Sequence, residues 1–246
     1  SGPWTIDSAG NTYVRNKDLS YVLNLINDFG QISEIALNEK QTPEQIAIGP
    51  DGLIYAAFFG DYIHSNVCVA QFSKTGIQSK IWDIKSKYGS LFGLPKYGGG
   101  GVGGLACSGN NIYLAVMNNI YRLDVNGYAF NAKWERHGTI SALATDSKGN
   151  IYIAYHGANN KSVVEKLDPN GTVLAQIGGS GPGQGNHLFP DGIAVDSSGN
   201  VFVADTDNHV IRKITPKVEV TTLGGTAGIA GISDGVGGSA RFSSPQ

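Results

Sequence analysis

The chain has 246 residues, of which 41% are hydrophobic and 15% charged, and its formal net charge is −2. This length and apolar content are sufficient for a single all-β domain with a buried core. The sequence contains no run of 18 apolar residues that could cross a membrane, and it does not start with a basic and then apolar leader. Because basic and acidic residues nearly balance, we expect neither nucleic-acid binding nor membrane insertion.

Short runs of alternating apolar residues, separated by turns rich in Gly, Asn, Asp and Pro, follow one another along the whole chain. Such runs predict β-strands, and here they fall into groups of four. In chain order the predicted strands cover residues 4–7, 12–14, 21–26 and 32–37; 45–48, 54–58, 67–72 and 80–84; 104–107, 112–116, 120–124 and 132–136; 141–146, 151–155, 162–168 and 173–177; and 192–196, 201–205, 210–214 and 218–223. The sequence shows no convincing amphipathic helix, so the predicted fold class is all-β.

The groups are copies of one repeat. An aromatic residue follows the first turn of each copy, at Tyr13, Tyr55, Tyr113, Tyr152 and Phe202, which gives spacings of 42, 58, 39 and 50 residues. A period of roughly 40 to 50 residues with four strands per copy is typical of a β-propeller, in which each copy forms one four-stranded antiparallel blade. Stacking the blades buries sheet faces that a lone blade would leave exposed to water.

The turn between the first two strands reads IDSAGN, TDSKGN and VDSSGN in three of the copies. The Asp side chain can accept hydrogen bonds from amides of the turn, while Gly10, Gly149 and Gly199 supply the positive φ of a tight hairpin. We therefore interpret these Asp and Gly residues as structural, and not as metal or phosphate ligands.

A family resemblance is carried by the fifth copy. Residues 190–214, PDGIAVDSSGNVFVADTDNHVIRKI, together with the following VTTLGG and DGVGGSARFSSPQ, resemble the NHL repeat, a propeller blade. The resemblance is closest over residues 187–246, extends through 140–178 and fades before residue 104. It implies a propeller of a kind found in bacterial secreted proteins, in RNA-binding regulators and in some lyases. Asn208 and His209 match the two residues that name the repeat.

We predict one NHL-type propeller domain over residues 1–246. Its blades are expected at about residues 1–38, 45–84, 104–136, 140–178 and 190–225, with a tail at 226–246. Because ARFSSPQ at 240–246 is similar to the lead-in HLFPDG at 187–192, the alternative is that these five blades are part of a six-bladed ring.

Function in a propeller is usually carried by the loops of one face and the mouth of the central channel. With the first strand innermost, second-to-third strand loops and blade-to-blade connections leave on the same side, and all five histidines fall on these segments. The binding residues predicted for this face are His64, His137, His156, His187, Asp61, Tyr62, Tyr155 and Arg15. Four of the histidines, His64, His137, His156 and His187, are candidate ligands for a divalent metal. Alternatively, His209 caps a tight turn and the other four are solvated loop residues, in which case no cofactor is bound.

A long insertion at residues 85–103 explains the 58-residue spacing and carries Tyr88, Phe92 and Tyr97. Exposed aromatic residues on a loop often mark a recognition surface, although here they could equally fold down over the channel. The glycines at 98, 100 and 103 fit a dinucleotide-binding pattern, but no helix follows to bind a phosphate.

The function we predict is a non-enzymatic binding scaffold that presents one loop face and the channel mouth to a protein, peptide or glycan. The alternative, implied by the resemblance, is a metal-assisted lyase or hydrolase with a histidine-lined site. A low charge content with many Asn, Ser and Thr residues favours a secreted, periplasmic or cell-surface protein. Two cysteines, Cys68 and Cys107, do not make a disulfide framework. They could form one disulfide in an oxidising compartment, but buried free thiols are expected.

Overall fold

The computed structural model describes residues 4–16, 18–19, 21–37, 42–59, 67–83, 101–127, 130–157, 162–178 and 190–246. In this part of the chain the regular elements are strands and two single-turn 3-10 helices, η2 (Thr206–Asn208) and η3 (Gly237–Ser239). The all-β prediction is confirmed. Among the described residues, neither helix approaches the length or apolar character needed to span a membrane.

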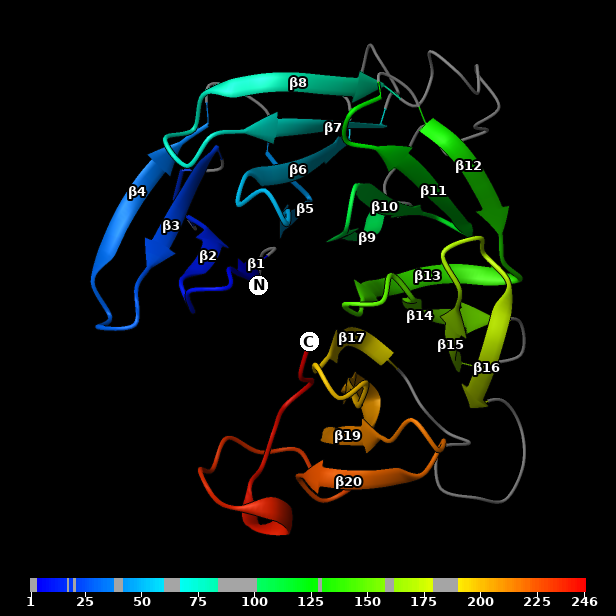
Figure 1. Cartoon of the computed structure of the whole chain (residues 1–246). Coiled ribbons are helices and arrows are strands. Elements are labelled where there is room, and N and C mark those ends of the chain that lie inside the picture. Colours follow the sequence, from blue (N-terminus) through cyan, green and yellow to red (C-terminus); the bar gives the residue numbers. More distant parts are fainter. Residues whose placement is uncertain are drawn as a thin grey trace. The chain divides into compact units, whose positions relative to one another are not determined.

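The strands form five four-stranded antiparallel sheets (Figure 1). Blades 1 to 5 comprise β1 (Trp4–Ile6), β2 (Thr12–Arg15), β3 (Val22–Ile26) and β4 (Ile32–Ala36); β5 (Gln45–Ile48), β6 (Ile54–Phe59), β7 (Val67–Phe72) and β8 (Gln78–Asp83); β9 (Val102–Ser108), β10 (Asn111–Val116), β11 (Asn119–Asp124) and β12 (Phe130–Glu135); β13 (Gly138–Thr145), β14 (Ile151–Gly157), β15 (Ser162–Leu167) and β16 (Val173–Gly178); and β17 (Pro190–Val195), β18 (Val201–Asp205), β19 (Val210–Ile214) and β20 (Val220–Gly224). Each sheet pairs its strands in chain order. The fold is thus a β-propeller fold with five blades, as predicted.

The chain divides into two compact units, residues 1–133 and 134–246, with the division inside β12. Unit 1 contains blades 1 and 2 and most of blade 3, and unit 2 contains blades 4 and 5. Within unit 1 the first strand of blade 2, β5, contacts both β1 and β9, and within unit 2 β13 contacts β17. First strands of successive blades are therefore neighbours within each unit. The assignment of all 246 residues to one domain stays a prediction.

Within each unit the core lies between the facing sheets of neighbouring blades. The repeated aromatic residue is central to each of these clusters: Tyr13 packs between blades 1 and 2, Tyr55 between blades 2 and 3, and Tyr152 between blades 4 and 5. All three side chains are buried. Since burying a large apolar side chain contributes about 1.5–3 kcal/mol, this repeated position helps to stabilise each of these contacts between blades.

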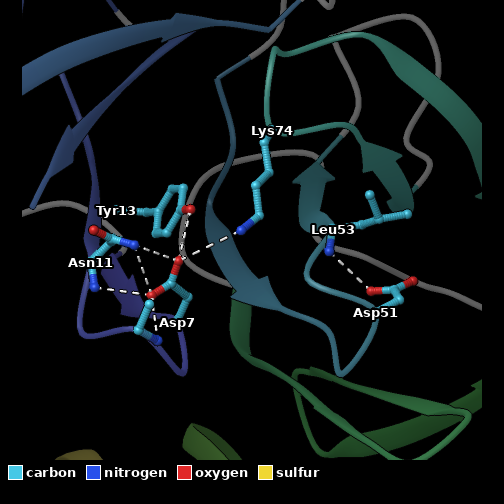
Figure 2. Close-up of polar contacts among 7 residues, drawn as sticks. Asp7, Asn11, Tyr13, Asp51, Leu53 and Lys74 are labelled. Carbon is cyan, nitrogen blue, oxygen red and sulfur yellow. Dashed lines mark hydrogen bonds and ion pairs between the residues drawn. The ribbon is translucent and has the colours of Figure 1, made fainter.

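The first turn of blade 1 shows why Asp and Gly recur in the repeat. Asp7 Oδ1 accepts hydrogen bonds from the backbone N–H groups of Ala9 (3.0 Å) and Asn11 (2.9 Å), and Oδ2 accepts one from the Tyr13 hydroxyl at 3.1 Å (Figure 2). Gly10 has φ 84°, which L-residues rarely adopt. The predicted structural role of the turn is confirmed.

These contacts also shift ionisation. Burial raises the pKa of Asp7, but hydrogen bonds from Asn11, Tyr13 and Ala9 outweigh it and hold the pKa below the ordinary 3.8. Burial and the hydrogen bond to Asp7 raise the pKa of Tyr13 to about 12. Lys74, from the turn between β7 and β8 of blade 2, reaches towards the same carboxylate, with Nζ 3.9 Å from Oδ2 (Figure 2).

Some strand boundaries differ from the prediction. Val218 was expected to begin the last strand, but it lies in a turn with φ 69°, where its N–H donates to Thr215 O, and β20 begins at Val220. His156 was expected on a loop but lies within β14, because the strand stays paired with β13 as far as Gly157. Pairing of Pro190 with Asp205 likewise starts β17 two residues early.

The meander sorts the connections of every blade to two ends. The turns between first and second strands, which contain Asp7, Asp51, Asp146 and Asp196, define the turn end together with the third-to-fourth turns. The second-to-third turns and the connections to the next blade define the loop end. The candidate site residues belong to the loop end.

Candidate functional site

Seven of the predicted binding residues fall outside the described part of the chain. These are Asp61, Tyr62, His64, Tyr88, Phe92, Tyr97 and His187. The predicted role of the insertion at 85–103 therefore stays a prediction. Of its last three residues, which are described, Val102 and Gly103 begin β9. Arg15, His137, Tyr155 and His156 are described.

The three predicted residues of unit 2 lie together at the loop end of blade 4. His137 is exposed and directly precedes β13, and His156, near the end of β14, pairs with Thr139 of β13. Tyr155 is adjacent in β14 and pairs with Ile140. Their grouping follows from the register between β13 and β14. Arg15, at the end of β2, is half-buried at the loop end of blade 1 in unit 1.

His156 joins three strands through its two ring nitrogens. Nδ1 lies 2.9 Å from Ser162 Oγ in β15, and Nε2 lies 3.3 Å from Asp191 Oδ1 in β17 of blade 5. The His156 and Asp191 side chains are 40% and 39% exposed, whereas Ser162 is buried. Although Ser, His and Asp form a chain here, the hydroxyl is not accessible to a substrate. The arrangement can link blades 4 and 5, and it does not present a nucleophile.

A second polar cluster lies beside it, inside blade 4. The buried carboxylate of Glu165 accepts a hydrogen bond from the Tyr155 hydroxyl at 2.9 Å and another from Gln176 Nε2 at 3.1 Å, and Arg136 Nε lies 3.1 Å from its other oxygen. Burial, then the hydrogen bond and the charge of Glu165, raise the pKa of Tyr155 to about 12. Arg136 also donates to Gly171 O at 3.2 Å. Tyr155 is therefore a neutral phenol held by an ion pair.

Sequence reasoning selected Tyr155 but missed Arg136, Glu165 and Gln176. The signal for Glu165 was present in the strand SVVEKL, where it takes the position of an apolar residue in the alternation and pairs with the buried Ile153. A charged residue at such a position requires a partner. Nothing in the spacing identifies Arg136 as that partner.

Blade 5 has a comparable buried cluster of hydrogen bonds at its loop end. Asp205, which is fully buried, accepts hydrogen bonds from Asn208 Nδ2 at 2.7 Å and Arg212 Nε at 3.0 Å. His209 has φ 57° and ends helix η2, and its Nδ1 accepts a hydrogen bond from Ser244 N at 3.2 Å. The Asn-His pair of the repeat therefore shapes a turn and holds the C-terminal segment.

The arrangement of these described side chains does not support the metal hypothesis. Across the described ranges, no three His, Cys, Asp or Glu side chains converge as metal ligands would. His137 and His156 share an end of blade 4, while the other two candidates, His64 and His187, lie outside those ranges. Cys68 and Cys107 are half-buried thiols and are not joined in a disulfide.

Fold and repeat together define the class: the chain is a β-propeller repeat protein. A family model described as NHL repeat matches residues 188–214, and one described as strictosidine synthase-like, N-terminal, matches residues 27–59. Residues 188–214, which span β17 to β19, are thus an NHL repeat, as the sequence resemblance predicted.

Among characterised sequences, the chain is 37% identical over 70 residues to NHL repeat-containing protein 2 of Gallus gallus and 35% identical over 88 residues to its Bos taurus counterpart. These matches cover 26% and 33% of this chain. They cover 10% and 12% of the relatives, so the chain aligns with about a tenth of their length.

Solved structures of similar fold include virginiamycin B lyase from Staphylococcus aureus (TM-score 0.62, 17% identity, 90% of this chain and 69% of that chain). Others are a structural genomics protein of unknown function from Bacteroides thetaiotaomicron (0.69, 19%, 98% and 62%) and a chain of the Mitotic Checkpoint Complex (0.61, 15%, 92% and 64%). At these identities the likeness establishes the fold alone.

Proposed function

We propose that this chain is a non-enzymatic scaffold that binds a protein or peptide at the loop end of its blades. The observation that carries the proposal is that ion pairs and hydrogen bonds fix the side chains and turns at this end of unit 2. Arg136, in the connection before β13, pairs with Glu165 of β15. His156 of β14 pairs with Asp191 of β17, and Asp205 at the end of β18 pairs with Arg212 of β19.

A locked surface suits binding because it loses little conformational freedom when a partner docks. In blade 4 the ion pair fixes Tyr155, and in blade 5 the lock fixes the turn that exposes Asp207. His137 and Asp207 are consequently exposed polar groups on a rigid base. Exposed charged and polar groups contribute specificity in protein recognition.

The test places a photo-crosslinking amino acid at one exposed position per variant. His137 and Asp207 probe the loop end of blades 4 and 5, and Lys148 and Ser198 are matched turn-end controls on the same two blades. In extract of the source organism, we expect loop-end variants alone to give a discrete protein adduct, which excess unlabelled chain abolishes. The captured protein, once purified, should bind the chain saturably, with at least tenfold loss of affinity for Asp207→Lys and none for Ser198→Lys.

Equal adducts at both ends, or an affinity that Asp207→Lys leaves unchanged, would overturn the loop-end assignment. The alternative of a metal-assisted lyase or hydrolase is favoured by one observation, the shared position of His137 and His156. If that alternative holds, zinc should raise the melting temperature, a chelator should reverse the rise, and a His156→Ala variant should show neither effect.

A further inference from the structure

The residues that follow β20 form a segment, 225–242, that is irregular apart from helix η3 and is closed by its own backbone hydrogen bonds (Figure 1). Gly225 N donates to Gly237 O at 3.0 Å, and Gly231 N donates to Phe242 O at 2.9 Å. These bonds join the first half of the 225–242 segment to its second half. The segment therefore has a defined backbone although it contains no strand.

The 225–242 segment is also attached to the turn that exposes Asp207. Gly228 N donates to Asn208 O, in that turn, at 3.0 Å. A Cβ on Gly225 would lie 3.1 Å from Phe242 Cδ2, so the Phe242 ring packs directly against the backbone where the segment leaves β20. All of these contacts lie within unit 2. The segment and the turn at 206–209 therefore form one surface at the loop end of blade 5.

This surface carries aliphatic side chains that take no part in the core. Ile232 and Val236 are 93% and 91% exposed, and Ile229 is 49% exposed. Because an aliphatic side chain stabilises a fold by leaving water, side chains as exposed as Ile232 and Val236 contribute almost nothing to the stability of unit 2. The hydrogen-bonded backbone nevertheless holds them on a fixed base. Apolar side chains grouped on an ordered surface and bordered by polar residues mark sites of protein interaction.

The charges that border these aliphatic side chains are acidic. Asp207 and Asp234 are exposed, and among the described residues neither carboxylate belongs to an ion pair. The basic residues of the same surface are engaged: Arg212 pairs with the buried Asp205, and Arg241 donates to carbonyl oxygens of its own segment. The exposed, unpaired charges of this surface are therefore negative.

We propose that Ile232 and Val236, bordered by Asp207 and Asp234, bind a cationic peptide segment of a partner protein, with a large apolar side chain of that peptide as the anchor. This inference rests on the proposed function and names the partner class for the same loop end. Charge complementarity selects the occupant, because the two carboxylates attract Lys and Arg side chains. The same carboxylates are repelled by an anionic membrane surface, and a symmetric contact with a second copy of the chain would bring like charges together.

The experiment selects peptides on the full chain from a displayed library of random sequences, with the double variant Ile232→Lys, Val236→Lys as the counter-target. We expect the enriched peptides to combine an aromatic or leucine residue with two or more Lys or Arg residues. Synthetic copies of these peptides should bind the chain saturably and bind the double variant at least tenfold more weakly. Their affinity for the chain should fall as salt is added, because the carboxylates are exposed.

Two controls separate loss of binding from loss of folding. Since Ile232 and Val236 are exposed, the double variant should melt within about 2 °C of the native chain. Ile77→Lys is the matched substitution elsewhere, because Ile77 is 64% exposed in the turn between β7 and β8, at the turn end of blade 2. It should leave peptide binding unchanged.

The proposal is overturned if no peptide is enriched, if the enriched peptides are acidic, or if they bind the double variant as tightly as the native chain. Binding of the chain to phosphatidylcholine–phosphatidylserine vesicles that the double variant loses would identify a membrane as the occupant and would also overturn it. So would protection of the Ile232 methyl group from a soluble gadolinium chelate in the free chain, because the surface would then already be covered.

Failure of this inference is distinguishable from failure of the proposed function. If Asp207→Lys weakens binding of the cross-linked partner and the double variant does not, the loop-end assignment stands and the apolar anchor site is wrong. If the loop-end positions give no specific adduct at all, the proposed function itself fails.

Discussion

The first turns of the blades and the contacts between blades at the loop end are held by the same types of bond acting over very different lengths of chain. In the first turn of blade 1, Asp7 and its hydrogen-bond partners are two to six residues apart. At the loop end, His156 contacts Asp191 across 35 residues, and Glu44 accepts a hydrogen bond from Val102 N across 58. The first turn of a blade therefore forms within a hairpin, whereas these contacts between blades at the loop end form only when neighbouring blades pack.

Breaking the ion pair inside blade 4 should have the largest effect. Glu165→Ala removes the carboxylate that pairs with the Arg136 guanidinium and accepts the Tyr155 hydrogen bond, and we expect the free energy of unfolding to fall by about 3–5 kcal/mol. Urea denaturation measures the loss. The double variant Arg136→Met with Glu165→Leu removes both charges and should recover most of it, and a double variant as unstable as the sum of the single ones would contradict this account.

This comparison also explains what the sequence could predict. The Asp and Gly of the turns were predictable because every partner lies in the same short motif, and the five blades were predictable because the aromatic residue repeats. Glu165 stood out as a charge in an apolar alternation, but its partner Arg136 belongs to the preceding connection, and only the packed blade brings the two together. Strand ends were also missed where a long-range pairing, such as Pro190 with Asp205, extends a strand beyond its apolar run.

Alkaline pH should be the next most damaging condition. Tyr13 and Tyr155 have pKa values raised to about 12, and Tyr55 and Tyr152 are also raised, in each case first by burial. Because these folded-state pKa values exceed the ordinary 10, the stability they contribute is complete below pH 10 and is lost as pH rises towards 12. At pH 11 we expect the ionisation of Tyr13 and of Tyr155 each to lower the free energy of unfolding by about 1 kcal/mol. Urea midpoints measured between pH 8 and 11 should fall steadily, and a Tyr155→Phe variant should fall less steeply.

Acidic pH should destabilise the turn end, because the pKa of several of its Asp side chains is lowered in the folded protein. Burial raises the pKa of Asp146, but hydrogen bonds from Asn150, Tyr152 and Lys148 outweigh it, so the net pKa is lowered. A lowered folded-state pKa contributes stability above the unfolded value of about 3.8, and this is lost as pH falls below it. Asp146→Ala should therefore remove about 1–3 kcal/mol at pH 7, because Tyr152 loses its acceptor, and should flatten the stability profile below pH 4. Asp168→Ala, in a turn whose hydrogen bonds come from backbone amides, is the matched control and should lose less.

The smallest effect is expected for Lys74, although its ammonium reaches across from blade 2 towards the turn of blade 1 (Figure 2). The Lys74 side chain is 59% exposed and its Nζ is 3.9 Å from Asp7 Oδ2, whereas Arg136 and Glu165 are 13% and 7% exposed and 3.1 Å apart. Water and salt screen the exposed pair, so Lys74→Met should change the free energy of unfolding by less than about 0.5 kcal/mol. The change should shrink further in 0.5 M salt. A loss above about 1 kcal/mol that persists in salt would mean that this contact stabilises the packing of blade 1 on blade 2, as the buried pair stabilises blade 4. The first turn of blade 1 would then depend on a long-range contact as well as on its local hydrogen bonds.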